Sequence, residues 1–410
     1  MRKIAVDVDP LELGLDPDRV ARIGDHFDEY VESGKLPGYA ALVARGNEIC
    51  YLRMYGRRDL ESSDPIEDDT IYRIYSMTKP VTSVAAMMLY EEGRFELTDP
   101  VSSFLPEFER QEVFVGGSSV RPVLRPAALP LEIWHLLTHT AGLTYGFMYQ
   151  HPVDAMYRAA GFEWGVPDGA DLAECCRCWA SLPLLFEPGT SWNYSHATDV
   201  LGRLIEVISG VGLDEFFLSR IFEPLGMEDT GFAAAPQQRE RLATLYMPDA
   251  KTGRALPAGR LGHVPSKNPS VLSGGGGLIS SLGDYYQFAR MLLNEGELDG
   301  YRLLSPRTLR YMATNHLPGG ADIETFGTPT PSEPEAGVGF GLGFSVVIDP
   351  VAMRSLGTKG TFAWGGAAST AFWVDPTEEL IVIFMTQLLP SSTYPIRRHL
   401  RQLVYQALVA

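Results

Sequence analysis

Apolar residues follow two different periods along this chain, and the order of those periods restricts the possible folds. Residues 39–45 and 49–55 predict two strands, because Gly46 and Asn47 between them suit a tight hairpin turn. From Tyr72 to about Ala336 the dominant pattern is helical. Strand-like runs then return near the C-terminus, at residues 343–349, 360–364, 369–375 and 380–386.

One antiparallel sheet built from both ends of the chain explains this order. Two N-terminal strands alone would be only marginally stable, so the simplest arrangement pairs them with the four C-terminal strands. Helical spacing over residues 17–33 and 394–409 predicts two helices on a face of that sheet. We therefore expect an α/β protein of the α+β type. Its sheet lobe comprises residues 1–70 and 337–410, and its mainly helical lobe comprises residues 71–336. We expect the active site to lie in the cleft between these two lobes.

Composition restricts the classes of partner. The 410 residues are 45% hydrophobic and carry a formal net charge of −17. Such an acidic chain repels nucleic acid and anionic membrane surfaces, and we expect no cluster of Lys and Arg to form a local basic patch. We therefore expect a small-molecule substrate and neither a nucleic acid nor a membrane as partner. The sequence leaves the oligomeric state open.

Cysteine usage and the first residues favour a cytoplasmic location. The four cysteines are too few for a disulfide framework in a chain of this length, and residues 1–10 lack the apolar segment of a signal peptide. No later apolar run is long enough to span a membrane. Residues 175–178 contain a CxxC spacing, but no second Cys or His pair lies nearby to complete a zinc site.

Ser76 and Lys79 begin the most apolar run of the chain. Residues 81–90 are mostly apolar on every side, which predicts a helix buried all round, and an ammonium group buried there is costly without a partner. Burial and the positive end of the helix dipole both favour a neutral Lys79 amine. At spacing i, i+3 that amine can accept the Ser76 hydroxyl proton, so we expect Ser76 to be a nucleophile.

An ordinary structural explanation competes with this one. A serine that caps a helix, followed by a lysine whose amine extends to water, has the same spacing. The chain has only six lysines, however, and only Lys79 has a serine three residues before it. The single Ser-x-x-Lys match therefore occurs where the lysine is hardest to solvate.

Five segments together resemble a known family. They are SMTK at 76–79, WHLLTHTAG at 134–142, FEPGTSWNYS at 186–195, EPLGMEDTG at 223–231 and SGGGGLISS at 273–281. In this order they resemble the serine hydrolases related to class C β-lactamases and penicillin-binding proteins. The resemblance implies a β-lactamase-like fold and a covalent acyl-enzyme on Ser76.

The resemblance implies that Tyr194 completes the base system. A phenol beside Lys79 could relay a proton to the leaving group, whereas position alone would favour a tyrosine packed in a loop. The family usually has an asparagine two residues after this tyrosine, and here that residue is His196. A histidine there could orient the substrate, assist the base or be structural, and the sequence leaves these alternatives open.

A C-terminal strand motif bears on the substrate. The family carries Lys-Thr-Gly there, but the Lys-Thr-Gly of this chain, at 251–253, follows Pro248 and Asp249 and predicts an exposed turn. The matching strand position is Trp364, Gly365 and Gly366, followed by Ala367. The resemblance assigns the oxyanion-binding backbone N–H groups to Ser76 and Ala367, and places the glycines where the backbone approaches substrate.

Trp-Gly-Gly in place of Lys-Thr-Gly is the mark of family VIII carboxylesterases. Trp364 replaces the cation that would attract a carboxylate, so we expect a serine carboxylesterase for neutral, short-chain esters. An acyltransferase using the same acyl-enzyme is the alternative. A weak β-lactamase and a catalytically silent binding protein rank lower.

Aromatic and histidine residues after the second motif are less decisive. Tyr145, Phe147 and Tyr149 either line the pocket or pack a loop, and Tyr145 is included among the expected substrate-binding residues. His135 and His139 have the i, i+4 spacing of zinc ligands, but no glutamate of an HExxH motif lies between them. No cofactor and no metal are therefore expected.

Overall fold

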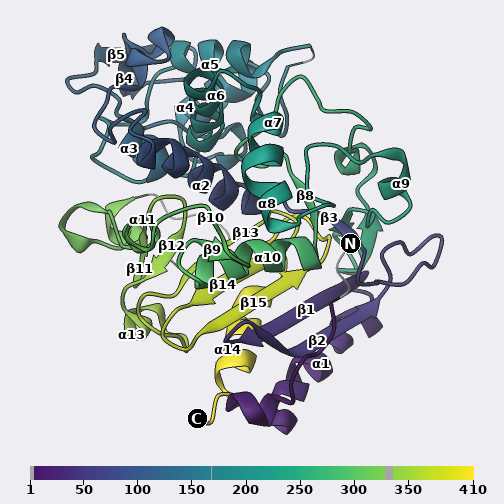
Figure 1. The fold of residues 1–410 in the computed structure, drawn as a ribbon. Coiled ribbons are helices and arrows are strands. Elements are labelled where there is room, and N and C mark those ends of the chain that lie inside the picture. Colours follow the sequence, from purple (N-terminus) through teal and green to yellow (C-terminus); the bar gives the residue numbers. More distant parts are fainter. Residues whose placement is uncertain (1–3, 168, 328–335) are drawn as a thin grey trace.

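Seven antiparallel strands from the two ends of the chain form the central sheet of the computed structural model, which describes residues 4–167, 169–327 and 336–410 (Figure 1). The strands are β1 (Gly38–Arg45), β2 (Glu48–Gly56), β11 (Val338–Phe340), β12 (Ser345–Val347), β13 (Phe362–Gly365), β14 (Ala371–Asp375) and β15 (Leu380–Met385). Their order across the sheet is β11-β12-β13-β14-β15-β1-β2. The two ends meet where β1 pairs with β15, so the predicted shared sheet is confirmed.

One strand was not expected from the sequence. β11 pairs with β12 from Val338 opposite Val347 to Phe340 opposite Ser345, at the edge of the sheet. β11 has only three residues, one of which is Gly339, and so short a run cannot show the alternation of a strand. β12 is also shorter than the predicted strand at 343–349.

The strands near the middle of the sheet are buried on both faces. In β15 the side chains of Leu380, Val382 and Phe384 enter the core beneath helices α1 (Pro17–Glu32) and α14 (Ile396–Tyr405). The alternate residues Ile381, Ile383 and Met385 enter the larger core shared with the helical part of the chain. Figure 1 shows α10 (Leu282–Leu293) lying over that second face. This double burial explains why β15 is a continuous apolar run.

The two terminal helices were expected and pack together on one face. α1 begins after Asp16, whose carboxylate accepts a hydrogen bond from the Arg19 backbone N–H at 3.0 Å. α14 is shorter than the predicted 394–409. Its last residues leave the helix because the chain after Tyr405 bonds to the segment before α1: Asp16 N donates to Ala407 O at 2.9 Å, and Val409 N to Gly14 O at 2.9 Å.

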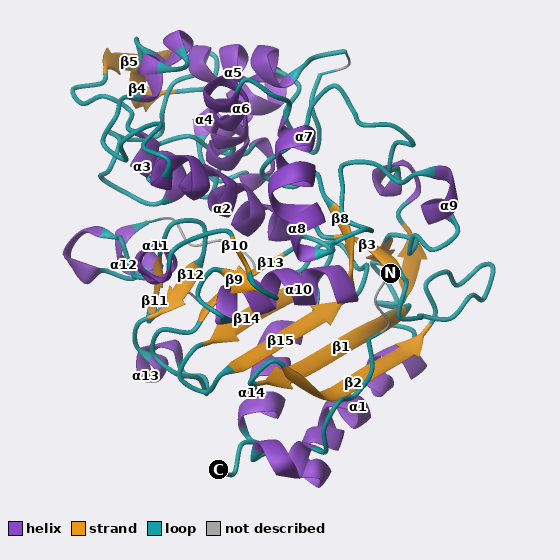
Figure 2. Cartoon of the chain, in the orientation of Figure 1, coloured by secondary structure: helices purple, strands orange, loops and turns teal. Residues whose placement is uncertain are grey.

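Most remaining helices lie in a separate layer (Figure 2). They are α2 (Thr78–Glu91), α3 (Ile133–Leu137), α4 (Pro152–Ala159), α5 (Leu172–Ser181), α6 (Ala197–Ser209), α7 (Leu213–Phe217) and α8 (Glu223–Leu225). Short helices α11 (Pro306–Met312), α12 (Ile323–Phe326) and α13 (Pro350–Met353) lie instead near the β11 and β12 end of the sheet, and α9 (Pro236–Arg239) lies to one side (Figure 2). Four small hairpins or paired strands accompany them: β3 (Ile71–Arg73) with β8 (Ile279–Ser281), β4 (Glu112–Gly117) with β5 (Pro122–Pro126), β6 (Tyr246–Pro248) with β7 (Ala255–Pro257), and β9 (Glu297–Leu298) with β10 (Tyr301–Arg302).

α2 is buried along almost its whole length. Every residue from Thr78 to Leu89 is buried, including Lys79, which is 1% exposed. A helix that is apolar all round can be stable only inside a core, and α2 packs against α6 on one side and near the sheet on the other. The helix therefore fixes its first residues rigidly.

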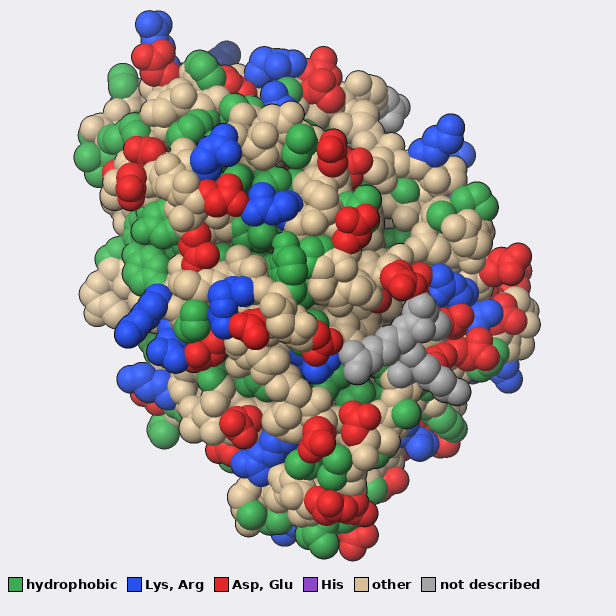
Figure 3. All heavy atoms as spheres, viewed as in Figure 1, with side chains coloured by type: hydrophobic (Ala, Val, Ile, Leu, Met, Phe, Trp, Pro, Cys, Tyr) green, Lys and Arg blue, Asp and Glu red, His purple; other side chains and the backbone are tan. Residues whose placement is uncertain are grey.

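The division into a sheet lobe and a helical lobe stays a prediction, and residues 1–3, 168 and 328–335 of those ranges lie outside the described residues. In the described part of the chain, no helix is both long and apolar enough to cross a membrane. Charged side chains of both signs are interspersed on the face shown in Figure 3.

Candidate active site

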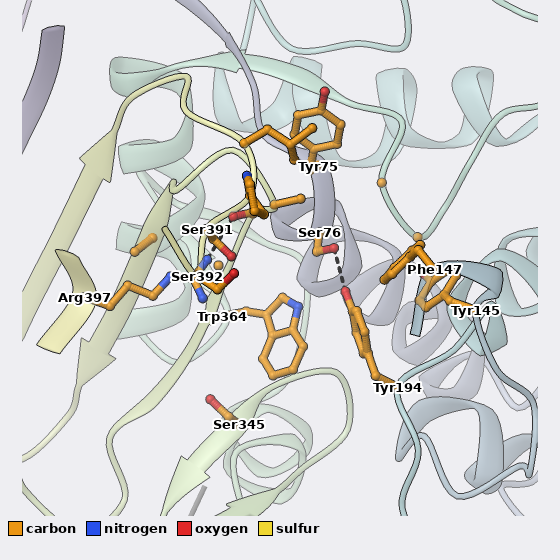
Figure 4. Close-up of a pocket in the computed structure, with 18 of the residues that line it drawn as sticks. Tyr75, Ser76, Tyr145, Phe147, Tyr194, Ser345, Trp364, Ser391, Ser392 and Arg397 are labelled. Carbon is orange, nitrogen blue, oxygen red and sulfur yellow. Dashed lines mark hydrogen bonds between the residues drawn. The ribbon is translucent and has the colours of Figure 1, made fainter. Parts of the chain in front are cut away.

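Ser76 lies in a tight turn that leads directly into α2. The turn is a short 3-10 helix, Tyr75–Met77, and α2 follows at Thr78. Tyr75 has a φ of 43°, a left-handed conformation that is unusual for a residue with a bulky side chain. Such local strain persists only where the surrounding structure enforces it. The turn presents the Ser76 hydroxyl to a cavity that Ser76 also lines (Figure 4).

The buried amine of Lys79 is held by three oxygen atoms. Its Nζ lies 2.6 Å from the Gly275 carbonyl oxygen, 3.0 Å from the Tyr145 hydroxyl and 3.4 Å from the Ser76 hydroxyl. The i, i+3 spacing thus brings the amine to Ser76 as expected. These polar contacts offset the cost of burying Lys79.

Tyr194 makes the shortest contact to Ser76. The two hydroxyl oxygens are 2.5 Å apart, and the Lys79 Nζ lies 4.5 Å from the centroid of the Tyr194 ring (Figure 4). The loop that carries Tyr194 is anchored on both sides: the Asn193 backbone N–H donates to the His139 carbonyl at 2.9 Å, and the His139 ring shares a 3.2 Å hydrogen bond with Ser195. Serine, lysine and tyrosine therefore converge in space.

A second tyrosine joins this group. Tyr145 is 7% exposed, and its hydroxyl reaches Lys79 rather than solvent. Burial raises its pKa well above the usual value, and the nearby Tyr194 and Asp199 raise it further. Tyr145 was expected only as a pocket-lining residue. Its contact with Lys79 joins residues 66 positions apart, and no local sequence pattern reports such a contact.

His196 is buried and paired with a carboxylate. Its Nδ1 lies 2.9 Å from Asp199, one helical turn further on, and its ring stacks on Trp179 at 4.4 Å and meets the Tyr145 ring edge-on at 4.3 Å. Burial lowers the pKa of His196 and outweighs the opposing effect of Asp199. The ring is thus neutral at pH 7, and its Nδ1–H donates to Asp199.

Asp199 connects this pair to the lysine. Burial alone would raise the pKa of Asp199, but the His196 hydrogen bond and further contacts hold it below the usual value. The ionised carboxylate accepts hydrogen bonds from the Ser273 hydroxyl at 2.6 Å and the Gly275 backbone N–H at 2.9 Å. The carbonyl of that same Gly275 contacts Lys79. The roles of Asp199 and Gly275 were not predicted, although the spacing of Asp199 three residues after His196 hinted at a shared helix face.

The end of β13 lies against the Ser76 turn. A Cβ atom at Gly366 would lie 2.4 Å from the Ile74 carbonyl oxygen, a separation that only glycine tolerates. Ile74 precedes the Ser76 turn by one residue, so this close approach brings the backbone of Ala367 near Ser76. Trp364, on the same strand, lies with its ring centroid 5.6 Å from that of Tyr194.

A cavity of about 660 Å³ joins these groups. Ser76, Tyr194, His196, Tyr145 and residues 364–367 all line it. On one side Phe147 stacks between Tyr145, at 4.7 Å, and Trp164, at 4.9 Å. The cavity is thus large enough for a small organic substrate and has an aromatic wall.

Two other motifs lie outside this cavity. Lys251 is in the exposed turn between β6 and β7, where the Asp249 carboxylate accepts hydrogen bonds from the backbone N–H groups of Lys251 and Thr252. The predicted turn is therefore confirmed. His135 accepts from the Glu132 backbone N–H, and among the described residues no group of three or more His, Cys, Asp or Glu side chains could hold a metal ion.

Comparison with known proteins identifies the family. A profile of the beta-lactamase family matches residues 23–406. The chain belongs to the beta-lactamase family. Protein Rv1367c of Mycobacterium tuberculosis, strain H37Rv, is 37% identical over 366 residues, which is 88% of each chain. Esterase EstB of Burkholderia gladioli is 34% identical over 420 residues, covering 98% of this chain and 99% of that one.

Solved structures agree with this assignment. The structure of EstCE1, described as a hydrolase with promiscuous acyltransferase activity, superimposes with a TM-score of 0.78 at 27% identity, covering 96% of this chain and 99% of that one. The expected β-lactamase-like fold is therefore confirmed. Within the beta-lactamase family this member has Trp364 on β13 and His196 after the tyrosine.

Proposed function

We propose that this protein is a serine carboxylesterase whose nucleophile is Ser76. The observation that carries the proposal is the convergence of Lys79 and Tyr194 on the Ser76 hydroxyl, at 3.4 and 2.5 Å. The Ser76 oxygen attacks the ester carbonyl carbon while its proton passes to this pair. The tetrahedral intermediate then collapses, the alcohol leaves with the returned proton, and an acyl-Ser76 remains. Water attacks that acyl group by the reverse proton path and releases the acid.

The contacts of Lys79 suit it to work with Tyr194 as the base. Its three oxygen neighbours fix the amine near Ser76, and none of the three is a carboxylate. Tyr194, which lines the cavity and contacts Ser76, is in position to return the proton to the leaving oxygen. Tyr145 keeps its own proton at neutral pH because its pKa is raised, so its role is to position Lys79.

The backbone N–H groups of Ser76 and Ala367 form the proposed oxyanion hole. The close approach of Gly366 to Ile74 supports this assignment, because it brings the two segments together without an intervening side chain. Hydrogen-bond donors fixed in this way need no rearrangement when negative charge develops on the carbonyl oxygen.

Trp364 supports the choice of ester. The indole forms an apolar wall beside Tyr194, and its Nε1 has no hydrogen-bond partner among the described residues. An apolar wall there, in the position where relatives place a cation, favours a neutral and short acyl group next to Ser76, as in family VIII carboxylesterases. Gly365, Gly366, His196 and Tyr145 complete the proposed substrate-binding surface.

An acyltransferase that passes the acyl group to an alcohol is the second candidate. Its support is the likeness to EstCE1, a hydrolase with promiscuous acyltransferase activity. The two functions share every step up to the acyl-enzyme, and only the acceptor differs. β-Lactam hydrolysis ranks third, because the carboxylate-binding lysine and the asparagine after the tyrosine are replaced. A silent binding protein ranks last. A cytoplasmic location and the cleft between the two lobes as the site belong to the same proposal.

Hydrolysis of p-nitrophenyl butyrate and of a chromogenic cephalosporin, by the native protein and Ser76→Ala, tests the proposal. We expect ester turnover that falls at least about a thousandfold in Ser76→Ala, with little lactam turnover in either. Full ester turnover by Ser76→Ala would overturn the mechanism. Added alcohol separates the two candidates, since a transferase makes more new ester than free acid.

A further inference from the structure

The cavity continues from Ser76 past the end of β13 to the opposite face of the sheet. Register places Ser345 opposite Ala363 and Ala363 opposite Trp373, so these three side chains share the face that carries α1 and α14. All three line the same cavity as Ser76. We call this part of the cavity the outer groove. It also includes Met353, Ser355 and the three arginines of α14, Arg397, Arg398 and Arg401.

Glycines at the end of β13 lie between the Ser76 part of the cavity and the outer groove. A Cβ at Gly365 would lie 2.3 Å from the Arg397 guanidinium, so glycine there lets this side chain lie against the end of β13. Arg397 in turn donates to the Gly366 and Thr370 carbonyls, at 2.9 and 3.1 Å. In Figure 4, Arg397 and Ser345 lie on the far side of Trp364 from Tyr194. Arg397 thereby connects the β13 end to the outer groove.

Three arginines on one side of α14 border this groove. Arg397 and Arg401 are four residues apart and Arg398 and Arg401 three, so all project to the same side of the helix, and all three line the cavity. The expectation that no basic cluster interrupts the acidic sequence was therefore wrong. The three arginines are close together in the sequence, but only the tertiary structure shows that they line a cavity.

The acidic side chains described in the cavity lining lie away from Arg398 and Arg401 in sequence and are engaged elsewhere. Among the described lining residues, the acidic ones are Glu163 and Asp199, both in the helical part of the chain. Asp199 is engaged by His196 and Glu163 by Tyr149. The Arg401 guanidinium lies over the Trp373 ring at 5.3 Å, and its Nη1 has no hydrogen-bond partner among the described residues. A guanidinium held against an aromatic ring at the edge of the cavity, in a chain of net charge −17, is suited to a single anionic group.

We propose that the outer groove is an anion subsite, and that the substrate is an ester carrying a carboxylate or phosphate at its end remote from the ester bond. The proposal rests on the esterase function and deepens it. The group next to Ser76 stays apolar against Trp364, while the remote anion pairs with Arg398 and Arg401. The fixed separation between the two ends selects chain length.

Matched p-nitrophenyl esters test the subsite. One series ends in methyl groups and the other consists of monoesters of dicarboxylic acids from succinate to suberate. A second pair of series, made of acetate esters and followed by release of acid, carries the methyl or carboxylate on the alcohol instead. Each is assayed with native protein, Arg398→Gln, Arg401→Gln, and Arg307→Gln as a control that loses the same charge on exposed α11. A phosphate in place of the terminal carboxylate distinguishes the two anions.

We expect Arg398→Gln and Arg401→Gln each to raise KM about tenfold for anionic esters of the best chain length, and to change the neutral esters less than twofold. Arg307→Gln should leave both unchanged. The subsite would be overturned if the two variants changed KM equally for neutral and anionic esters, or changed it in neither the acyl nor the alcohol series. Either result would leave the esterase function intact.

A binding measurement separates failure of the subsite from failure of the esterase. Calorimetric titration of Ser76→Ala with monoethyl adipate and with diethyl adipate needs no turnover. We expect the monoanion to bind more tightly, and the difference to vanish in Ser76→Ala/Arg401→Gln. Equal binding of the two esters by Ser76→Ala would contradict the proposal whatever the enzyme hydrolyses.

Discussion

The Nδ1 atom of His196 lies 2.9 Å from the Asp199 carboxylate, and this buried pair supports Lys79 from two directions. The Asp199 carboxylate accepts a hydrogen bond from the Gly275 backbone N–H, and the Gly275 carbonyl accepts one from Lys79. The His196 ring packs on Tyr145, whose hydroxyl also contacts Lys79. Among the described residues, the hydrogen bond and ring contacts of His196 go to Asp199, Trp179 and Tyr145 rather than to Ser76. It is therefore best described as a positioning residue.

Replacement of His196 by Phe should slow catalysis without abolishing it. Phenylalanine keeps a ring on Trp179 but leaves the buried Asp199 with only its Ser273 and Gly275 donors, so we expect Asp199, Gly275 and Lys79 to shift. We expect kcat for p-nitrophenyl butyrate to fall roughly 10- to 100-fold with little change in KM. Loss of a partner for a buried charge should also cost about 1–3 kcal/mol in the free energy of unfolding, measured with urea.

His399→Phe is the matched control for that variant, since His399 pairs with His26 between α1 and α14, outside the cavity lining. Its kcat should stay near that of the native protein. The pH profile of kcat distinguishes positioning from simple loss of fold: a displaced Lys79 moves the profile, whereas partial unfolding lowers it uniformly. An unchanged kcat and profile in His196→Phe would contradict the positioning role.

The two tyrosines beside Lys79 should differ in importance. Tyr194 contacts Ser76 directly, whereas Tyr145 reaches only the amine. We expect kcat to fall roughly a thousandfold in Tyr194→Phe but only about tenfold in Tyr145→Phe, by analogy with direct and supporting groups in other enzymes. Steady-state kinetics with one ester measures both. A larger loss in Tyr145→Phe would exchange the two proposed roles.

Gly366 should tolerate no side chain. A methyl group there would contact the Ile74 carbonyl and the Thr370 hydroxyl at 2.4 and 2.2 Å, and relief of that contact must move Ala367. We expect kcat to fall roughly 100-fold in Gly366→Ala, the size associated with loss of one oxyanion donor. Gly116→Ala, in the open hairpin of β4 and β5, has no atom within 4 Å of the new methyl group and should be neutral.

Circular dichroism and thermal melting accompany these assays, so that a misfolded Gly366→Ala is recognised. If the variant folds normally and retains full kcat, the Ala367 N–H is not part of an oxyanion hole.

Asp284 should make the fold less stable as pH rises from about 4 to 6. Burial raises the pKa of Asp284 to about 6, although Thr230 and the Asp229 backbone N–H donate to it. The unfolded pKa is lower, so the native state binds more protons in this window. Stability is greatest below the unfolded pKa and declines through the folded one, by up to about 3 kcal/mol.

Urea unfolding of native protein and Asp284→Asn at several pH values measures this effect. The difference between the two curves should change between pH 4 and 6 and be constant above pH 7. Parallel curves across that window would show that Asp284 does not titrate with a raised pKa.

Local patterns in the sequence identified the sheet and the first two members of the site. Period-two runs at both ends predicted strands, and a uniformly apolar helix headed by Lys79 predicted a buried amine three residues from a serine. These features depend on neighbours within one or two turns of backbone, so they can be read from spacing alone. The strand at Val338–Phe340 was not predicted, because three residues are too few to show an alternating pattern.

Tertiary structure alone decided how distant residues meet. Tyr145 lies 66 residues from Lys79, and Gly275 lies 196 residues from it, yet both contact its amine. The arginines of α14 are close together in sequence, but only the tertiary structure places them beside the end of β13 and in the lining of the cavity. Long-range contacts follow from how the cores of the sheet and of α2 pack, which residue spacing does not specify. The sequence thus determined the elements and the reactive pair, whereas packing determined the partners that give the pair its environment.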